Sequence, residues 1–132
     1  YGPGQFLRPT SISIDDQDRL FVSDACNHRV QVFDTQGKVL HYWGHRGAEP
    51  GEMCFAYGLA LGPADTLYVC EYGNSRVSHY ALDGTFLSAW GGPGHRSGQL
   101  YSPWGLGLDA KANRLLVADT NNNRILIVSP LP

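Results

Sequence analysis

The sequence predicts an all-β fold built from tandem repeats, and three observations lead to this prediction. The chain of 132 residues carries the same set of short motifs three times. Within each copy, short apolar runs alternate with polar residues or are rich in β-branched residues, and turn residues separate the runs. Sixteen glycines and eight prolines argue against long helices, because both residues break helix interiors.

The repeat spacing is 47 residues. The tripeptide Gly4-Gln5-Phe6 aligns with Gly51-Glu52-Met53 and with Gly98-Gln99-Leu100. Three apolar runs that end in Asp or Glu then align, at residues 19–24, 66–71 and 114–119. An Asn-x-Arg-Val or Asn-x-Arg-Ile motif follows each of them. The third copy has one extra residue, which we place in the turn at residues 111–113.

Each copy is expected to form one blade of a β-propeller. The first copy contains four apolar runs of about five residues, the length of ordinary strands, around residues 12–14, 20–22, 30–33 and 39–43. Repeated four-stranded units of this size are typical of propeller blades. We therefore expect a single propeller segment over residues 1–132, with blades at about 4–47, 51–94 and 98–132, the last of them lacking its outer strand.

The same motifs resemble those of the NHL-repeat family. The matching elements are Gly-x-Phe, a Pro before the first strand, Leu-x-Val-x-Asp, the run Asn27 to Phe33, and a closing Trp-Gly at residues 43–44 and 90–91. The phrases at residues 69–74 and 100–104 are similar to those of bacterial multi-repeat NHL proteins, which would make this chain a three-repeat fragment of such a protein. Family propellers typically close with six blades, so the resemblance implies half of a ring.

Three copies of one polar set flank the predicted turns between the second and third strands. Asp24 lies five residues before Arg29, a spacing at which carboxylate and guanidinium can pair across a tight turn. Asparagine suits such turns, because it tolerates left-handed backbone and bonds to it. Because all copies carry the set, we predict a structural role, and the set comprises Asp24, Asn27, Arg29, Glu71, Asn74, Arg76, Asp119, Asn122 and Arg124.

No catalytic or metal site is predicted. The five histidines occupy different repeat positions, whereas ligands on a propeller axis should recur at one inward-facing position. The three cysteines show no CxxC pairing. No nucleophile elbow, P-loop or dinucleotide motif is present. We therefore expect no cofactor.

Loops at one end of the blades are the best candidates for a binding site. The loop entering the inner strand and the turn between the second and third strands should open on the same face, which we call the mouth. Its side chains vary between copies while the frame repeats, as expected where recognition is built on a rigid scaffold. The predicted mouth residues are Thr10, Tyr57 and Trp104 from the first loop, and His28, Tyr72 and Asn121 from the turns. Tyr57 and Trp104 could alternatively plug the channel.

The leading functional hypothesis is a non-enzymatic scaffold that presents this mouth to a protein, peptide or glycan. One alternative is a metal-dependent lyase or hydrolase of the six-bladed type. A second is RNA binding, which the net charge of −2 disfavours. We also expect the chain to complete its ring with a second copy or with further blades, and we expect no membrane partner, because no apolar run approaches the ~20 residues of a spanning helix. The sequence leaves the compartment open, with a bacterial extracytoplasmic location among the possibilities.

Overall fold

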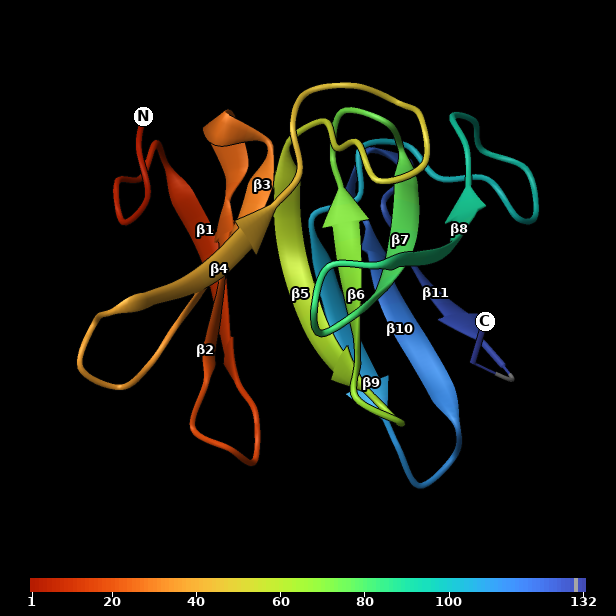
Figure 1. The fold of residues 1–132 in the computed structure, drawn as a ribbon. Helices are drawn as coiled ribbons and strands as arrows, with labels where there is room; N and C mark the ends of the chain where they lie inside the picture. The colour runs from red at the N-terminus through yellow and green to blue at the C-terminus, as the bar shows by residue number, and fades with distance from the viewer. Residues whose placement is uncertain (130) are drawn as a thin grey trace.

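A computed structural model describes residues 1–129 and 131–132, and it shows three antiparallel sheets in a row (Figure 1). The first sheet contains β1 (Pro9–Ile14), β2 (Leu20–Asp24), β3 (Arg29–Phe33) and β4 (Val39–Trp43). The second contains β5 (Ala56–Gly62), β6 (Thr66–Glu71), β7 (Arg76–Ala81) and β8 (Phe86–Gly91). The third contains β9 (Gly105–Asp109), β10 (Arg114–Asp119) and β11 (Arg124–Val128).

Strands follow one another in chain order within each sheet, so every sheet is a meander. Short 3-10 turns, η1 (Ala25–Asn27) and η2 (Thr120–Asn122), join the second and third strands of the first and third sheets. In the described part of the chain, the third sheet has three strands. No helix among the described residues is long and apolar enough to span a membrane. The predicted all-β fold of three blades, the last with three strands, is confirmed.

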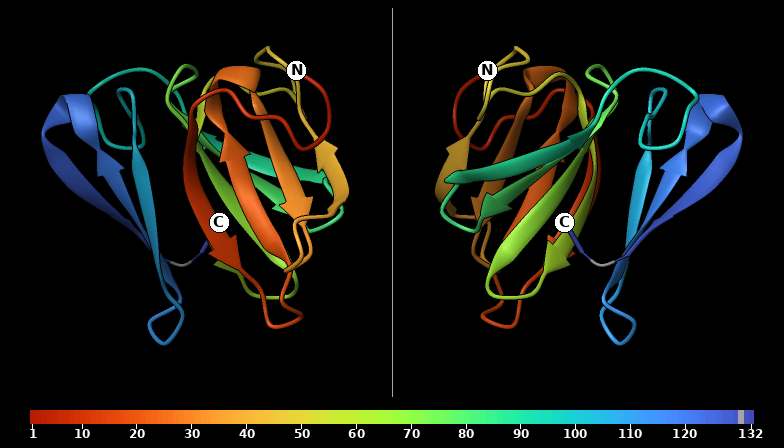
Figure 2. Two further views of the ribbon diagram at one scale, coloured as in Figure 1. Left: turned by 90° about the vertical axis from the view of Figure 1, so that its left-hand side faces the viewer. Right: turned by 90° about the vertical axis from the view of Figure 1, so that its right-hand side faces the viewer.

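The sheets fan out side by side, with their inner strands β1, β5 and β9 adjacent (Figure 2). Turns β1–β2 and β9–β10 project at one end of the fan, and the loops that lead into the inner strands lie at the other end (Figures 1 and 2). This arrangement follows from the repeat, because equivalent loops of stacked blades emerge on the same face.

Two hydrophobic cores lie between the sheets. In the first, Phe21, Val30 and Val32 of the first blade belong to one cluster with Leu59 and Val69 of the second blade. Met53, from the loop between these two blades, is fully buried in the same cluster. In the second core, Tyr68 and Val77 of the second blade cluster with Leu100, Leu115 and Val117. Each blade therefore packs on its neighbour through equivalent residues of the repeat.

Candidate binding site on the loop face

Local irregularities at the start of the inner strands shape the mouth. The pairing of β1 with β2 shifts register between Pro9 and Ser11, and the pairing of β5 with β6 shifts between Ala56 and Gly58. Thr10 and Tyr57 are thus the extra residues at these two points. A bulged residue leaves the ladder and its side chain is re-aimed, which is why bulges often occur beside functional sites.

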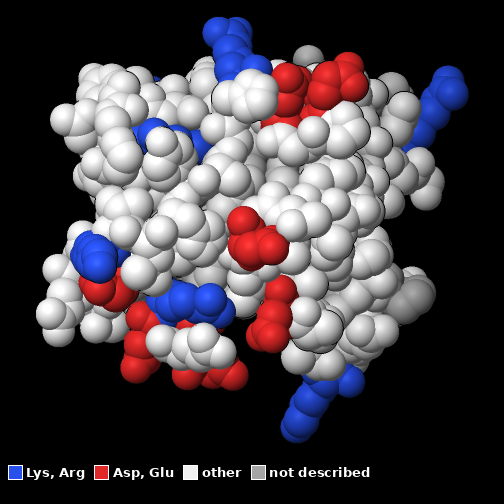
Figure 3. Space-filling model, in the orientation of Figure 1, with Lys and Arg blue, Asp and Glu red and all other residues white. Residues whose placement is uncertain are grey.

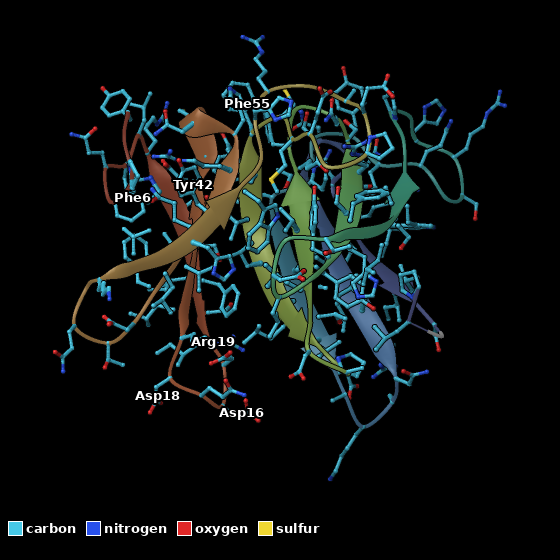
Figure 4. The ribbon with its side chains drawn as sticks, viewed as in Figure 1. Phe6, Asp16, Asp18, Arg19, Tyr42 and Phe55 are labelled. Atoms are coloured by element: carbon cyan, nitrogen blue, oxygen red, sulfur yellow. The ribbon has the colours of Figure 1, made fainter. Side chains whose placement is uncertain are left out.

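Four aromatic rings from different loops meet at this end of the molecule. The Tyr57 ring stacks on Tyr72, with centroids 4.8 Å apart, and its edge contacts Trp104, also at 4.8 Å. Tyr72 and Trp104 meet edge to face at 5.7 Å. Phe55 joins the group through Tyr57 at 6.4 Å, and it lies among the loops opposite Asp16 and Asp18 (Figure 4). The structure therefore brings three of the predicted mouth residues, Tyr57, Tyr72 and Trp104, into contact and adds Phe55 to the group.

Phe55 was missed because nothing in its residue type marks it as a loop anchor. It has a left-handed backbone with φ of 54°, and the equivalent residues Arg8 and Ser102 have φ of 57° and 49°. This conformation is uncommon for residues other than glycine. The residue types at this repeat position are Arg, Phe and Ser, so the sequence carries no recurring signal for this backbone conformation.

His28 connects the aromatic group to the first blade. It also has a left-handed backbone, with φ of 54°, as do Ser75 and Asn123 at the equivalent positions. The Phe55 N–H donates a hydrogen bond to His28 Nδ1 at 2.9 Å, and the two rings contact edge to face at 4.7 Å. Burial and the positive charge of Arg46 lower the pKa of His28. A neutral His28 whose proton is on Nε2 fits this geometry, because Nδ1 accepts.

Two of the predicted mouth residues, Thr10 and Asn121, contact backbone carbonyls and not the aromatic rings. The Thr10 hydroxyl donates to the Tyr57 carbonyl at 2.9 Å, and Ser23 Oγ donates to the same carbonyl at 2.9 Å. Thr10 therefore links the first two blades through this hydrogen bond, and the residue is exposed. Asn121 is exposed and its N–H donates to the Tyr101 carbonyl at 3.1 Å. Within the described residues, Asn121 makes no ring contact with the aromatic group.

The second predicted set forms one arrangement in all three blades. Asp24, Glu71 and Asp119 are fully buried, and each accepts hydrogen bonds from the Asn three residues later and the Arg five residues later. The Arg Nε to carboxylate distances are 2.8, 2.9 and 2.7 Å. The carboxylate also accepts a backbone N–H from the incoming loop, which in the third blade is Tyr101 N–H at 2.7 Å.

The guanidinium groups of these arginines bind the loop that leads into their own blade. Arg76 donates to the carbonyls of Ala48 at 2.7 Å and Glu52 at 2.9 Å. Arg124 donates likewise to His95 at 3.0 Å and Gln99 at 2.9 Å. Burial alone would raise the pKa of Asp119, but hydrogen bonds from Tyr101, Asn122 and Arg124 together hold that pKa below its usual value. Each carboxylate is saturated with donors, which fits a role in holding the loops of the mouth.

Titratable chemistry near the mouth is sparse. Burial raises the pKa of the Cys70 thiol to about 12, so the thiol stays protonated at neutral pH. Among the described residues, no three His, Cys, Asp or Glu side chains lie close enough together to hold a metal ion.

Charge separates the two ends of the molecule. Seven of the twelve acidic residues lie opposite the mouth: Asp15, Asp16, Asp18, Asp34, Asp65 and Asp83 in the turns there, and Asp109 at the end of β9. Figure 4 shows Asp16, Asp18 and Arg19 at that end. Uncharged surface covers much of the face between the charged groups (Figure 3). The aromatic group itself contains no carboxylate, and Arg46 lies close enough to His28 to affect its charge.

Solved structures of propeller proteins share this architecture. A nidogen–laminin complex contains a chain that matches 95% of the described fold with a TM-score of 0.71 and 21% identity, and this chain covers 45% of it. A streptogramin B lyase matches with a TM-score of 0.66 and 16% identity over 90% of this chain and 36% of the lyase. The virginiamycin B lyase of Staphylococcus aureus matches with a TM-score of 0.67 and 15% identity over 92% and 38%. The fold is that of a β-propeller.

Two of the blades match the NHL repeat. The NHL repeat family model matches residues 6–33 and 100–128. The protein brain tumor of Drosophila melanogaster is 31% identical over 52 residues, which are 39% of this chain and 5% of that protein. The B-box type zinc finger protein ncl-1 of Caenorhabditis elegans is 43% identical over 35 residues, 26% of this chain and 4% of that protein. These matches support the NHL-repeat family for the first and third blades, and the chain spans only a small part of the length of these relatives.

Proposed function

We propose that this chain is a binding propeller whose mouth holds a protein, peptide or glycan partner on the aromatic group of Phe55, Tyr57, Tyr72 and Trp104. The observation that carries the proposal is the mutual contact of Tyr57, Tyr72 and Trp104 across two blades. Rings that already pack on one another lose little conformational freedom on binding, so an aromatic anchor of this kind contributes affinity efficiently.

The chemistry of the mouth supports a partner that offers a flat or apolar group with acceptors around it. Trp104 is half-exposed, and among the described residues neither the Tyr57 hydroxyl nor the Tyr72 hydroxyl forms a hydrogen bond. These hydroxyls and the Trp104 indole N–H remain available as donors. With Arg46 close by and no carboxylate in the group, the mouth favours a neutral or acidic partner over a basic one.

A propeller enzyme is the second candidate, because a streptogramin B lyase and a virginiamycin B lyase are among the similar structures. An enzyme of this class in the present chain would need a catalytic metal or base on the channel axis. Metal analysis of the purified chain separates the two functions. A stoichiometric divalent ion that survives dialysis favours the enzyme, and its absence from an active binding protein favours the scaffold.

The binding test uses peptides selected from a random displayed library on the wild-type chain. We expect Trp104→Ala to weaken binding of the selected peptides at least about tenfold, because anchors of this type contribute about 2 kcal/mol or more. The far-ultraviolet circular dichroism of this variant should be unchanged, and Asp83→Ala, at the opposite end, should keep full affinity. Equal binding by Trp104→Ala would overturn the mouth as the site, and unfolding of this variant would make Trp104 a channel plug.

The proposal includes completion of the ring. The similar structures are propellers of which this chain spans between 36% and 45%, and three blades leave the sheet faces at both ends of the row without a neighbour. The missing blades come from a second copy or from further repeats.

A further inference from the structure

The aromatic group and His28 form a continuous series of ring contacts across three blades. His28 of the first blade contacts Phe55 with centroids 4.7 Å apart, and Phe55 contacts Tyr57 at 6.4 Å. Tyr57 and Tyr72 of the second blade contact Trp104, in the loop that leads into the third blade, at 4.8 and 5.7 Å. A series of rings suits an extended ligand that offers apolar groups at regular intervals.

The rings are packed too closely to enclose a cation. A site for a quaternary ammonium group surrounds the cation with aromatic faces, so its rings stand apart. Tyr57 and Tyr72 instead lie nearly parallel, with an interplanar angle of 25° and centroids 4.8 Å apart. Arg46 adds positive charge near His28. A ligand therefore lies on the outside of the rings, and the local charge disfavours a cationic one.

The group offers a ligand donors without strong acceptors. In residues 1–129 and 131–132, the Tyr57 and Tyr72 hydroxyls and the Trp104 indole N–H have no hydrogen-bond partner, and Trp104 is 52% exposed. The group contains no carboxylate or carboxamide, and the buried carboxylates of the three blades already accept from Asn and Arg side chains. A sugar hydroxyl donates as well as accepts, and an ordinary peptide has one N–H for each carbonyl, so both need acceptors.

A proline-rich segment matches these properties. Proline has a carbonyl but no N–H, so it needs donors from its site and no acceptors. Such segments adopt the polyproline II helix, which exposes its carbonyls and is already ordered before binding. This helix rises about 3.1 Å per residue, so alternate residues are about 6 Å apart. The ring spacings of 6.4 Å between Phe55 and Tyr57 and 5.7 Å between Tyr72 and Trp104 are close to this repeat.

We propose that the aromatic group binds a proline-rich segment of another protein in the polyproline II conformation. Prolyl rings pack on the aromatic rings, and carbonyls of the segment accept from the Tyr72 hydroxyl and the Trp104 indole N–H. This inference rests on the proposed function and deepens it, because it narrows a protein, peptide or glycan partner to one class. Binding of polyproline II segments on aromatic-lined surfaces is a recurrent mode of peptide recognition.

The test is titration calorimetry with three probes on the purified chain. The first probe is a peptide of twelve prolines, acetylated and amidated at its ends. The second is a Gly-Ser peptide of the same length, which has carbonyls but neither rings nor a fixed backbone, and the third is cellohexaose. We expect the proline peptide to bind at least about tenfold more tightly than the other two, because it alone combines apolar rings with unpaired acceptors.

Two variants of the aromatic group test the contacts separately. Trp104→Ala should weaken binding of the proline peptide at least about tenfold with unchanged far-ultraviolet circular dichroism. Tyr72→Phe keeps the ring and removes only the hydroxyl, so it should weaken binding about threefold or more, as expected for the loss of one neutral hydrogen bond. Because Tyr72→Phe preserves the packing, the test does not depend on the folding of Trp104→Ala.

Tyr101→Ala is the matched control, because Tyr101 is also 52% exposed and lies in the same loop as Trp104. Its ring contacts none of the aromatic group in the described part of the chain, so affinity should be unchanged. Equal binding of the proline and Gly-Ser peptides, tighter binding of cellohexaose, or full affinity in Tyr72→Phe would each overturn the inference. Library-selected peptides that lack proline but depend on Trp104 would also overturn it and leave the mouth standing. Proline binding that survives in folded Trp104→Ala would overturn both.

Discussion

At the scale of single residues, the molecule depends on buried carboxylates that are fully supplied with donors. Glu71 is buried and accepts from Asn74 Nδ2 at 2.7 Å and Arg76 Nε at 2.9 Å, and Ser78 Oγ also donates to it. Such a group is costly when one donor is removed, because the charge stays buried without full compensation.

Arg76→Ala should therefore lower the free energy of unfolding by about 1–3 kcal/mol, the usual range for losing a charged hydrogen-bond partner. The variant also frees the carbonyls of Ala48 and Glu52 in the incoming loop. Denaturant melts measure the change. His95→Ala, on an exposed side chain of the equivalent loop, should cost less than about 0.5 kcal/mol. Equal midpoints for the two variants would refute the structural role of Arg76.

His28 should make the first blade junction sensitive to acid. Its pKa is lowered in the folded chain, so the folded state binds fewer protons than the unfolded state. The stability that neutral His28 contributes is fully present above the pKa of the unfolded chain, about 6.5. It is lost as the pH falls through the lower pKa of His28 in the folded chain. Protonation would also place an N–H where Nδ1 accepts from Phe55.

Thermal melts at pH 7.5 and pH 5 measure this effect. We expect His28→Ser to reduce the loss of stability on acidification, because serine keeps an acceptor, as Ser75 does in the next blade, but does not titrate. Burial lowers the pKa of His79 as well, so part of the loss should remain. His95→Ser should leave the loss unchanged. Identical pH dependence in wild type and His28→Ser would contradict the assignment.

Individual residues also differ in how well the sequence predicts their structural role. The Asp24, Asn27 and Arg29 set was predictable, because hydrogen-bonding residue types recurred at fixed spacing around a turn. The left-handed backbone of Arg8 and Phe55 was not, because neither residue type favours that conformation and tertiary contacts impose it. The engagement of Thr10 with the Tyr57 carbonyl was equally hidden, because it depends on how closely two blades approach.

At the scale of elements, the apolar runs located the strands well because their period of two is preserved in every copy. The predicted runs around residues 20–22 and 30–33 lie within β2 and β3. The first strand begins earlier than its apolar core, at Pro9, since the bulge at Thr10 interrupts the alternation while pairing continues. Hydrophobic alternation identifies paired residues but not bulges, so strand ends were the least predictable feature.

Close packing of the inner strands gives an element-scale prediction. A Cβ on Gly58 would lie 3.0 Å from Gly105 Cα and 3.0 Å from Trp104 O, both in the backbone of the next blade. Backbone cannot give way as a side chain can, so Gly58→Ala should separate the second and third blades and destabilise the chain by about 1–3 kcal/mol, the usual cost of overpacking. Denaturant melts measure this cost.

Gly105→Ala is the matched control for that substitution, at the same repeat position of the third blade. Among the described residues, its Cβ would meet only the Ala118 side chain, at 3.9 Å. Gly105→Ala should therefore change stability by less than about 0.5 kcal/mol. Equal costs for the two glycines would contradict the packing.

At the scale of the whole molecule, the repeat sets the fold. Blades with equivalent faces pack on one another through equivalent residues. The sequence revealed the number of blades and their order. The aromatic mouth became visible only in three dimensions, because Tyr57, Tyr72 and Trp104 come from separate loops that the stacking of two blades brings together.

Titration calorimetry with a peptide selected on the wild-type chain tests the mouth most directly, since one measurement gives both affinity and stoichiometry. We expect Trp104→Ala to bind this peptide at least about tenfold more weakly than the wild type, and Asp83→Ala to bind it equally well. Equal affinity of the wild type and a folded Trp104→Ala would contradict the account.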